Sequence, residues 1–201
     1  MQIEVFADVW CPFAHVGLRR FVERREEAGA DVGVLVRAWP LERVNGEPMD
    51  PALIAEEVAE IRATVAPELF AGFDPARFPT TTIPALQLTC LAYARSPRVG
   101  EAVALELRDR LFERGEDVSD PAVLAAVAAA HGLDLDGADD LAGQDWEDGK
   151  RRGVIGSPHF FTPGGDFFCP ALDVHQVDGH LRITADPEGF QRFLDSCFAG
   201  T

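Results

Sequence analysis

The hydrophobic and polar positions of the first forty residues predict a strand, a helix and a second strand. Residues 2–7 (QIEVFA) predict a short strand, and from Pro12 the apolar residues recur at helical spacing until Gly29. Residues 32–39 are rich in valine and nearly continuous in apolar character, as strands buried on both faces are. This order is a βαβ unit, so its crossover should be right-handed.

The middle of the chain, from about residue 50 to residue 150, has little strand signal and much helix signal. The predicted helices are residues 51–66, 84–94, 99–114, 121–131 and 138–152. The fourth of these is bounded most clearly, because Asp120 can cap its start and Gly132 can end it.

Strand signals return after Arg152. Residues 160–162 and 166–169 flank Pro-Gly-Gly and predict a hairpin. Asp178-Gly179 predicts a second hairpin turn, and Asp186-Pro187 opens a final helix. The chain therefore predicts an α/β fold.

The order of these elements predicts a split domain. Residues 1–48 and 150–201 form the two halves, and an all-helical insertion of residues 49–149 separates them. The net charge of −16, from 34 acidic and 18 basic residues, argues against a nucleic-acid partner. The start MQIEVFAD lacks a secretory pattern, and the longest charge-free apolar stretch is far too short to span a membrane. We expect a cytoplasmic protein with no membrane partner.

The candidate chemistry centres on Cys11, where the first predicted strand gives way to a helix. Pro12 occupies the position at which proline favours helix initiation. A sulfur at this point faces unpaired backbone N–H groups and the positive end of the helix dipole, which favour the thiolate. We therefore expect Cys11 to be reactive, with a lowered pKa, rather than a small buried apolar residue.

Residues 8–15 (DVWCPFAH) resemble the active-site turn of the thioredoxin superfamily, specifically of DsbA-like proteins with a helical insertion. That group includes frenolicin-biosynthesis-type oxidoreductases, 2-hydroxychromene-2-carboxylate isomerases and kappa-class glutathione transferases. Residues 111–120 (LFERGEDVSD) and 153–160 (GVIGSPHF) are also similar to the family. The resemblance covers almost the whole chain and implies a thioredoxin-like fold interrupted by an all-helical insertion.

The resemblance also implies a second wall for the site. In that family, the proline that matches Pro158 is cis and lies against the active-site sulfur, and the backbone of the residue matching Ser157 pairs with substrate. The residues alone leave open a trans loop that enters a strand. His159 follows the proline and points either towards the site or away from it.

The chain departs from the dithiol pattern at Ala14, where a dithiol enzyme has its second cysteine. A Cys-x-x-Cys pair resolves its own mixed disulfide by internal attack, and Cys-x-x-Ala cannot. Release from Cys11 then needs an outside thiol or a distant cysteine. Cys169 and Cys197 are candidates without supportive spacing, so we interpret both, and also Cys90, as structural.

Several residues near the sulfur have two interpretations each. His15 lies one helical turn after Cys11 and either assists the thiolate or is a half-buried histidine bonded to a backbone carbonyl. Trp10 and Phe13 flank the sulfur and form either an apolar substrate surface or part of a lid and core. Asp8 is a family-type turn residue or simply a capping carboxylate.

Two charged segments carry weaker signals. The acidic stretch 131–140 matches neither a calcium nor a zinc pattern, so we predict no metal site. The basic cluster 150–152 ends a predicted helix, where positive charge offsets the dipole, or it helps to bind an anionic thiol cofactor.

We predict a thiol–disulfide oxidoreductase that uses the turn Cys-Pro-Phe-Ala by a monothiol mechanism. The alternatives are a thiol-dependent transferase or isomerase of the kappa-class type and a redox-inactive binding module. The predicted catalytic residues are Cys11 and His15, and the predicted substrate-binding residues are Trp10, Pro12, Phe13, Ser157, Pro158 and His159. We expect a thiol or disulfide substrate, either a small molecule or a protein, and no tightly bound cofactor. A low-molecular-weight thiol is a candidate co-substrate, and a homodimer is an open alternative.

Overall fold

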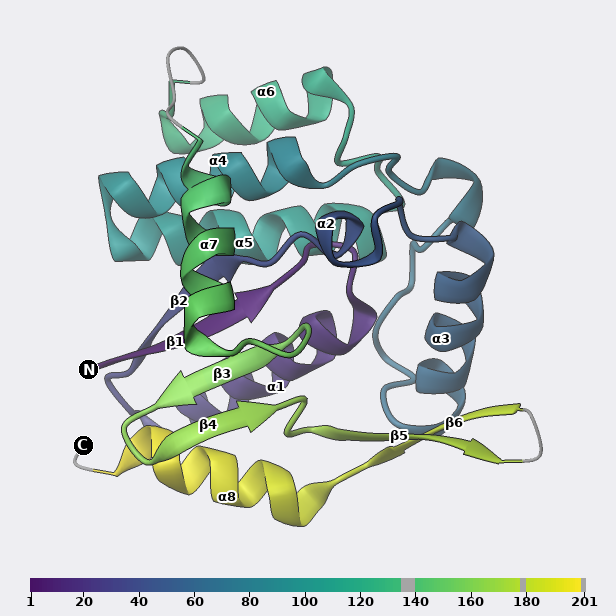
Figure 1. Cartoon of the computed structure of the whole chain (residues 1–201), viewed down its shortest axis with the longest axis vertical. Helices are drawn as coiled ribbons and strands as arrows, with labels where there is room; N and C mark the ends of the chain where they lie inside the picture. The colour runs from purple at the N-terminus through teal and green to yellow at the C-terminus, as the bar shows by residue number, and fades with distance from the viewer. Residues whose placement is uncertain (135–139, 178–179, 200–201) are drawn as a thin grey trace.

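A four-stranded sheet lies at the centre of the computed structural model (Figure 1), which describes residues 1–134, 140–177 and 180–199. Strands β1 (Gln2–Ala7) and β2 (Gly33–Ala38) run parallel, as the βαβ pattern predicts. Strands β3 (His159–Thr162) and β4 (Gly165–Phe168) form an antiparallel hairpin, and β3 pairs antiparallel with β1. The strand order is β2-β1-β3-β4, which joins the two ends of the chain in one sheet.

Helices α1 (Pro12–Ala28) and α8 (Pro187–Phe198) cover one face of this sheet. Phe160 of β3 meets Phe193 of α8 with ring centroids 4.7 Å apart, and Phe193 in turn meets Phe21 of α1 at 5.9 Å. All three rings are buried, so the two halves of the chain share one apolar core.

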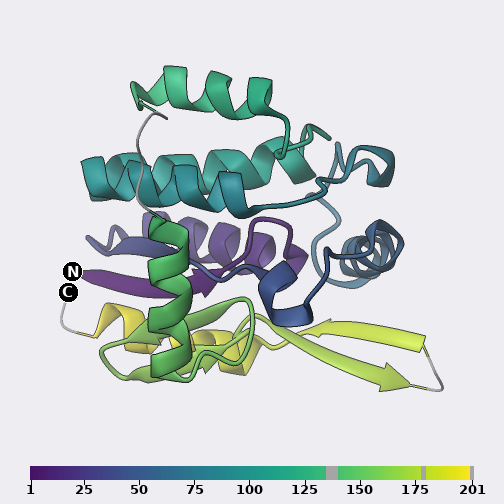
Figure 2. The ribbon, with the colours of Figure 1, turned by 45° about the horizontal axis from the view of Figure 1, so that its top comes forward.

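Helix α7 (Leu141–Arg152) crosses the other face of the sheet (Figures 1 and 2). The ring of Phe6 on β1 meets that of Trp39 after β2 at 6.3 Å. Gly149 of α7 lies against these rings, and a Cβ atom at this position would be 2.6 Å from the Trp39 ring. Glycine is therefore required where the helix crosses the strands.

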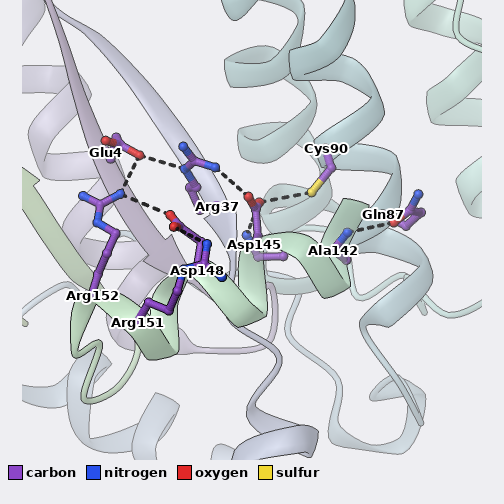
Figure 3. A network of polar contacts seen from close by, with 10 residues as sticks. Glu4, Arg37, Gln87, Cys90, Ala142, Asp145, Asp148, Arg151 and Arg152 are labelled. Atoms are coloured by element: carbon purple, nitrogen blue, oxygen red, sulfur yellow. Dashed lines mark hydrogen bonds and ion pairs between the residues drawn. The ribbon is translucent and has the colours of Figure 1, made fainter. Parts of the chain in front are cut away.

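A polar network fixes α7 to the sheet (Figure 3). Asp145 accepts hydrogen bonds from Arg37 at 2.8 Å and from the Ala38 N–H at 3.0 Å. Glu4 of β1 accepts from Arg37 at 2.7 Å and from Arg152 at 2.9 Å. The basic end of α7 is thus engaged with carboxylates of the sheet and of the helix itself.

The chain between β2 and α7 forms further helices. They are α2 (Leu41–Asn45), α3 (Pro51–Thr64), the 3-10 helix η1 (Pro75–Arg77), α4 (Ile83–Arg95), α5 (Pro97–Phe112) and α6 (Pro121–His131). Helices α4 and α5 pack against the edge strand β2. The Tyr93 hydroxyl donates to the Val34 carbonyl at 2.8 Å, and the Val34 N–H donates to Glu101 at 3.1 Å. These side chains satisfy an otherwise unpaired strand edge.

A second sheet consists of the hairpin β5 (Leu172–Val177) and β6 (His180–Ala185). It extends from the main body past α3 (Figures 1 and 2), and Arg182 of β6 pairs with Glu60 of α3 at 3.3 Å. The predicted turn residues Asp178 and Gly179 lie outside the described residues, but the strands beside them pair as predicted.

The predicted helices are confirmed with small shifts of their ends. Helix α1 ends at Gly29, whose φ of 60° is left-handed, and α6 ends at Gly132 in the same conformation. The short elements α2 and η1 were not predicted, because five and three residues are too few to show a helical period. The domain boundaries near residues 48 and 150 stay a prediction. Among the described residues, no helix is long and apolar enough to cross a membrane.

Candidate active site

Cys11 lies at the start of α1, after the turn of residues 8–10 that follows β1. It occupies the N-cap position with extended backbone, and its carbonyl accepts the first helical hydrogen bond from the His15 N–H at 3.2 Å. Pro12 stands at the start of the helix, where its missing N–H costs nothing. The Cys11 thiol donates to the carbonyl oxygen of Ser157 at 3.2 Å. The sequence thus placed the sulfur correctly at a helix start.

The expected lowering of the Cys11 pKa is wrong. Burial raises the pKa of this thiol to about 12, since only 3% of the residue is exposed to solvent. The hydrogen bonds with Ser157 and with the Ala14 N–H oppose this shift, and the carboxylates of Glu57 and Asp8 add smaller upward contributions. Burial is therefore the effect that outweighs the favourable position at the helix start.

The loop before β3 forms the wall opposite Cys11. The Ser157 hydroxyl accepts a hydrogen bond from the Asp8 N–H at 3.0 Å, and the Ser157–Pro158 peptide bond is cis. The Pro158 carbonyl accepts from the Cys169 N–H at 3.0 Å. The loop thus connects the end of β1 with the segment that follows β4.

A cavity of about 780 Å³ opens at the sulfur. Helices α1, α2 and α3, the segment from β4 to β5 and the start of α8 contribute to its walls. Predicted residues that line it are Cys11, Pro12, Phe13 and Ser157. Its charged lining residues are Glu57, Asp166, Asp173, Asp186 and Arg192. A cavity of this size can hold a small thiol or disulfide or an extended peptide segment.

Glu57 is a cavity residue that the sequence analysis missed. It lies on α3, three residues after Ile54 and four before Ile61, both of which are buried. Burial raises the pKa of its carboxyl to about 7. A carboxylate within the apolar stripe of a helix is the signal that could have identified it.

Cys169 is the second cavity residue that the sequence analysis did not place. It is half-buried and lines the same cavity as Cys11, with a left-handed φ of 45°. Burial, and then the charge of Cys11, raise the pKa of its thiol to about 12. Cys90 and Cys197 are buried in the apolar cores, which agrees with their structural interpretation. For Cys169, which lines the cavity, the structural interpretation stays a prediction.

Asp8 holds the turn before Cys11 together. Its carboxylate accepts from the N–H groups of Val9 and Leu41, each at 2.6 Å. Burial raises the pKa of this carboxyl to about 6, although both hydrogen bonds oppose the shift. Arg108 of α5, also completely buried, donates to the Asp8 carbonyl at 3.1 Å. Asp8 is therefore a capping residue of the turn, and Arg108 is a supporting residue that the sequence analysis missed.

His15 points into the helical insertion rather than towards the sulfur. Its Nε2 atom is 2.7 Å from the Glu113 carboxylate, and its ring packs against Phe70 at 5.2 Å and Phe112 at 5.0 Å. Burial lowers the pKa of His15, so its ring is neutral at pH 7 and donates to Glu113. The sequence analysis expected His15 either to assist the thiolate or to bond to a backbone carbonyl, and it did not name Glu113. To assist the thiolate, the imidazole would have to contact the Cys11 sulfur, and it contacts Glu113 instead.

Trp10 is also turned away from the cavity, which corrects its assignment as a substrate-binding residue. It is fully buried and stacks on Phe78 with ring centroids 5.8 Å apart. Trp10 is thus a core residue. Its side chain packs among buried residues of the helical insertion, whereas the Cys11 side chain faces the cavity.

Pro158 and His159 likewise lie behind the wall formed by Ser157, outside the cavity lining. The Nδ1 atom of His159 accepts from the Ile155 N–H at 3.3 Å, and Nε2 is 3.0 Å from Asp166. His159 therefore does not line the cavity itself, but it is hydrogen-bonded to Asp166, which does. The structure brings together four of the eight predicted site residues.

No metal site is found in the described part of the chain. Nowhere in it do three or more histidine, cysteine, aspartate or glutamate side chains gather as metal ligands. Asp136 and Asp139 of the acidic stretch lie outside the described residues.

The family model of the DSBA-like thioredoxin domain matches residues 2–182 of this chain. Among curated proteins, none matches the sequence closely enough to count as a relative.

Similar solved structures share the fold at low sequence identity. The cytosolic disulfide reductase DsbM from Pseudomonas aeruginosa has a TM-score of 0.60 and 13% identity, over 97% of each chain. A probable DsbA oxidoreductase from Streptomyces coelicolor has a TM-score of 0.62 and 18% identity, over 100% of this chain and 91% of that one. The 2-hydroxychromene-2-carboxylate isomerase has a TM-score of 0.59 and 13% identity, over 84% of this chain and 88% of that one. At these identities the likeness shows the fold.

Proposed function

Because this chain belongs to the DsbA-like thioredoxin domain family, we propose that it is a thiol–disulfide oxidoreductase whose attacking sulfur is Cys11. One observation carries the proposal. The Cys11 thiol lies at the start of α1 on the wall of an open cavity, opposite the carbonyl of Ser157. An incoming disulfide can reach this sulfur from the cavity, with Pro12 and Phe13 beside it.

The first step forms a mixed disulfide. The Cys11 sulfur loses its proton and attacks one sulfur of a disulfide R–S–S–R. The Cys11–S–S–R bond forms, the bond between the two substrate sulfurs breaks, and R–S⁻ leaves and takes up a proton. In a monothiol mechanism, a low-molecular-weight thiol R′–SH then attacks the R sulfur of the mixed disulfide, so that an R–S–S–R′ bond forms, the Cys11–S–S–R bond breaks and the Cys11 thiol takes up the proton. A second R′–SH reduces R–S–S–R′ to R–SH and R′–S–S–R′, which completes the two-electron reduction of the substrate.

The surroundings of Cys11 set the rate of this step. A thiol whose pKa is about 12 is almost entirely protonated at neutral pH, so attack is slow until a base removes the proton. We therefore expect exchange at Cys11 to be slow at neutral pH and faster in alkaline solution.

Intact-protein mass measurement tests the proposed function. The reduced full-length chain is incubated with oxidised glutathione at pH 8.5 and compared with a Cys11→Ser variant. We expect oxidation of the wild type at Cys11, seen as a glutathione adduct or as a disulfide that includes Cys11, and no such product in the variant. Equal modification of both proteins would overturn the proposal.

A transferase or isomerase of the kappa-class type is the second candidate. The raised pKa of Cys11 favours it, because a thiol that stays protonated can donate a hydrogen bond to a bound substrate without forming a disulfide. Calorimetric binding of reduced glutathione, together with no adduct at Cys11 after incubation with oxidised glutathione, would support this candidate. Failure both to bind and to react would leave a redox-inactive binding module.

The remaining expectations belong to the same proposal. We propose a cytoplasmic location, with a thiol or disulfide substrate and no tightly bound cofactor. The similar reductase DsbM is described as cytosolic, which supports the location. A homodimer stays an open alternative that sedimentation velocity can test.

A further inference from the structure

We propose that Cys169 is an internal resolving thiol for Cys11, so that a mixed disulfide at Cys11 closes into a Cys11–Cys169 disulfide. This inference rests on the proposed function. It keeps Cys11 as the attacking sulfur and adds a second, internal route of release to the one that uses an outside thiol.

The first support is that one loop holds both cysteines. The Cys11 thiol donates to the Ser157 carbonyl at 3.2 Å, and the Cys169 N–H donates to the carbonyl of the next residue, Pro158, at 3.0 Å. Two neighbouring carbonyl groups therefore anchor residues that lie at opposite ends of the sequence.

The second support is that both cysteines line the same cavity. Cys11 contributes from the start of α1, and Cys169 contributes from the turn between β4 and β5. A substrate disulfide bound to Cys11 therefore lies in the same cavity as the Cys169 side chain. The thiols are close enough for the charge of Cys11 to raise the pKa of Cys169.

The third support is the contrast with the other two cysteines. Cys197 is completely buried among the aromatic residues of α1 and α8, and Cys90 donates to Asp145 at 3.4 Å on the far side of β2. Neither lines the cavity at Cys11. Cys169 is half-buried, so its side chain is less enclosed than those of Cys90 and Cys197, which are both buried.

The closing step balances without another oxidant. Cys11–S–S–R is already oxidised by the substrate disulfide. The Cys169 sulfur loses its proton and attacks the Cys11 sulfur, the Cys11–Cys169 bond forms, and the second R–S⁻ leaves and takes up a proton. In total the two protein thiols lose two electrons and two protons, and one R–S–S–R becomes two R–SH. Two molecules of a low-molecular-weight thiol reverse the change and reset the protein.

The test uses the full-length chain and three variants. Reduced wild type, Cys169→Ser, Cys169→Ala and Cys197→Ser are incubated with oxidised glutathione, trapped with an alkylating reagent and weighed intact, and the disulfides are then located by peptide mapping. We expect the wild type and Cys197→Ser to lose the mass of two hydrogen atoms, with Cys11 and Cys169 joined. Both Cys169 variants should instead retain a glutathione adduct at Cys11.

The outcomes separate the two proposals. A stable adduct at Cys11 in the wild type, in the same yield as in the Cys169 variants, would overturn the resolving role and leave the proposed function intact. A disulfide that joins any other pair of cysteines would also overturn it. If folded Cys169 variants form no adduct at Cys11, the proposed function itself fails. Circular dichroism shows whether each variant is folded. Two different replacements of Cys169, by serine and by alanine, ensure that the result reflects loss of the thiol and not a property of the new side chain.

Discussion

The Nε2 atom of His15 lies 2.7 Å from the carboxylate of Glu113, which joins the first turns of α1 to the end of α5. The same carboxylate accepts from the N–H groups of Phe70 at 2.8 Å and Ala71 at 3.1 Å. Glu113 therefore ties three segments together directly behind the cysteine turn. This contact connects the split domain with its helical insertion, although the two residues lie far apart in sequence.

Replacement of Glu113 by glutamine should destabilise the fold. One carboxylate oxygen becomes an NH2 group, which donates and cannot accept, so at least one of the three N–H donors loses its partner. The bonds from His15 and Phe70 are partly buried, and such a donor left without a partner costs about 1–3 kcal/mol. Urea unfolding measures the loss of free energy, with Glu68→Gln, an exposed position, as the matched control. An unchanged unfolding midpoint in Glu113→Gln would contradict this role.

The contribution of Glu113 should also depend on pH. Although burial opposes ionisation, the bonds from His15, Phe70 and Ala71 lower the pKa of Glu113 from 4.5 to about 2 in the folded protein. The unfolded chain therefore binds a proton first, so this stabilisation is complete above about pH 4.5 and is lost as the pH falls towards 2. Unfolding free energies of the wild type and Glu113→Gln should converge across that interval. A constant difference between them would show that the carboxylate's charge does not matter.

Alkylation of Cys11 should become faster with pH up to very alkaline values. Because burial holds the pKa of its thiol near 12, the thiolate fraction and the rate rise about tenfold per pH unit between pH 7 and 10. Replacement of Glu57 by glutamine removes a charge that raises this pKa, so the variant should react faster at pH 9. Each unit by which the pKa falls gives about a tenfold gain.

Glu56→Gln is the matched control for this measurement, since Glu56 is the exposed neighbour of Glu57 on the same helix. Rates are read from the loss of Cys11 thiol by peptide mass, because the other cysteines also react with the reagent. A plateau of the wild-type rate below pH 8 would mean that the helix start, rather than burial, determines the pKa.

Local sequence signals predicted most of the fold. Pro12 and Gly29 bound α1, and the turn residues between β3 and β4 mark that hairpin, because these effects act over a few residues. The cysteine turn was recognisable for the same reason. Short elements such as α2 carry too few residues to show a period.

The residues that surround the sulfur depend on contacts between distant segments. Glu57 comes to the cavity because α3 packs near α1, and Cys169 because the Pro158 carbonyl holds its N–H. Neither contact leaves a pattern within its own segment. The pKa of Cys11 was mispredicted for a related reason, since the sequence shows the helix start and not the burial that outweighs it.

Replacement of Arg108 by methionine should be strongly destabilising. Its guanidinium is completely buried, donates to the carbonyls of Ala104 at 2.7 Å and Asp8 at 3.1 Å, and is the cation that favours ionised Asp8. A buried carbonyl oxygen left without its donor costs about 1–3 kcal/mol, and the substitution leaves the carbonyls of Ala104 and Asp8 without the guanidinium. Thermal unfolding should show a large drop in Tm for Arg108→Met and almost none for Arg98→Met, which is exposed on the same helix. Equal Tm values for the two variants would contradict the supporting role of Arg108.

Substitutions of Trp10 and Phe13, the two aromatic residues near Cys11, should affect different properties of the protein. Trp10 is fully buried against Phe78, so Trp10→Ala should lower the free energy of unfolding by about 3–5 kcal/mol. Phe13 lines the cavity and is only partly buried, so Phe13→Ala should cost less stability and raise the KM for a disulfide substrate. Urea unfolding together with reduction kinetics distinguishes the two effects, and Trp10→Phe, which keeps a ring against Phe78, should retain the wild-type KM. A raised KM in Trp10→Phe without loss of stability would show that Trp10 contacts the substrate.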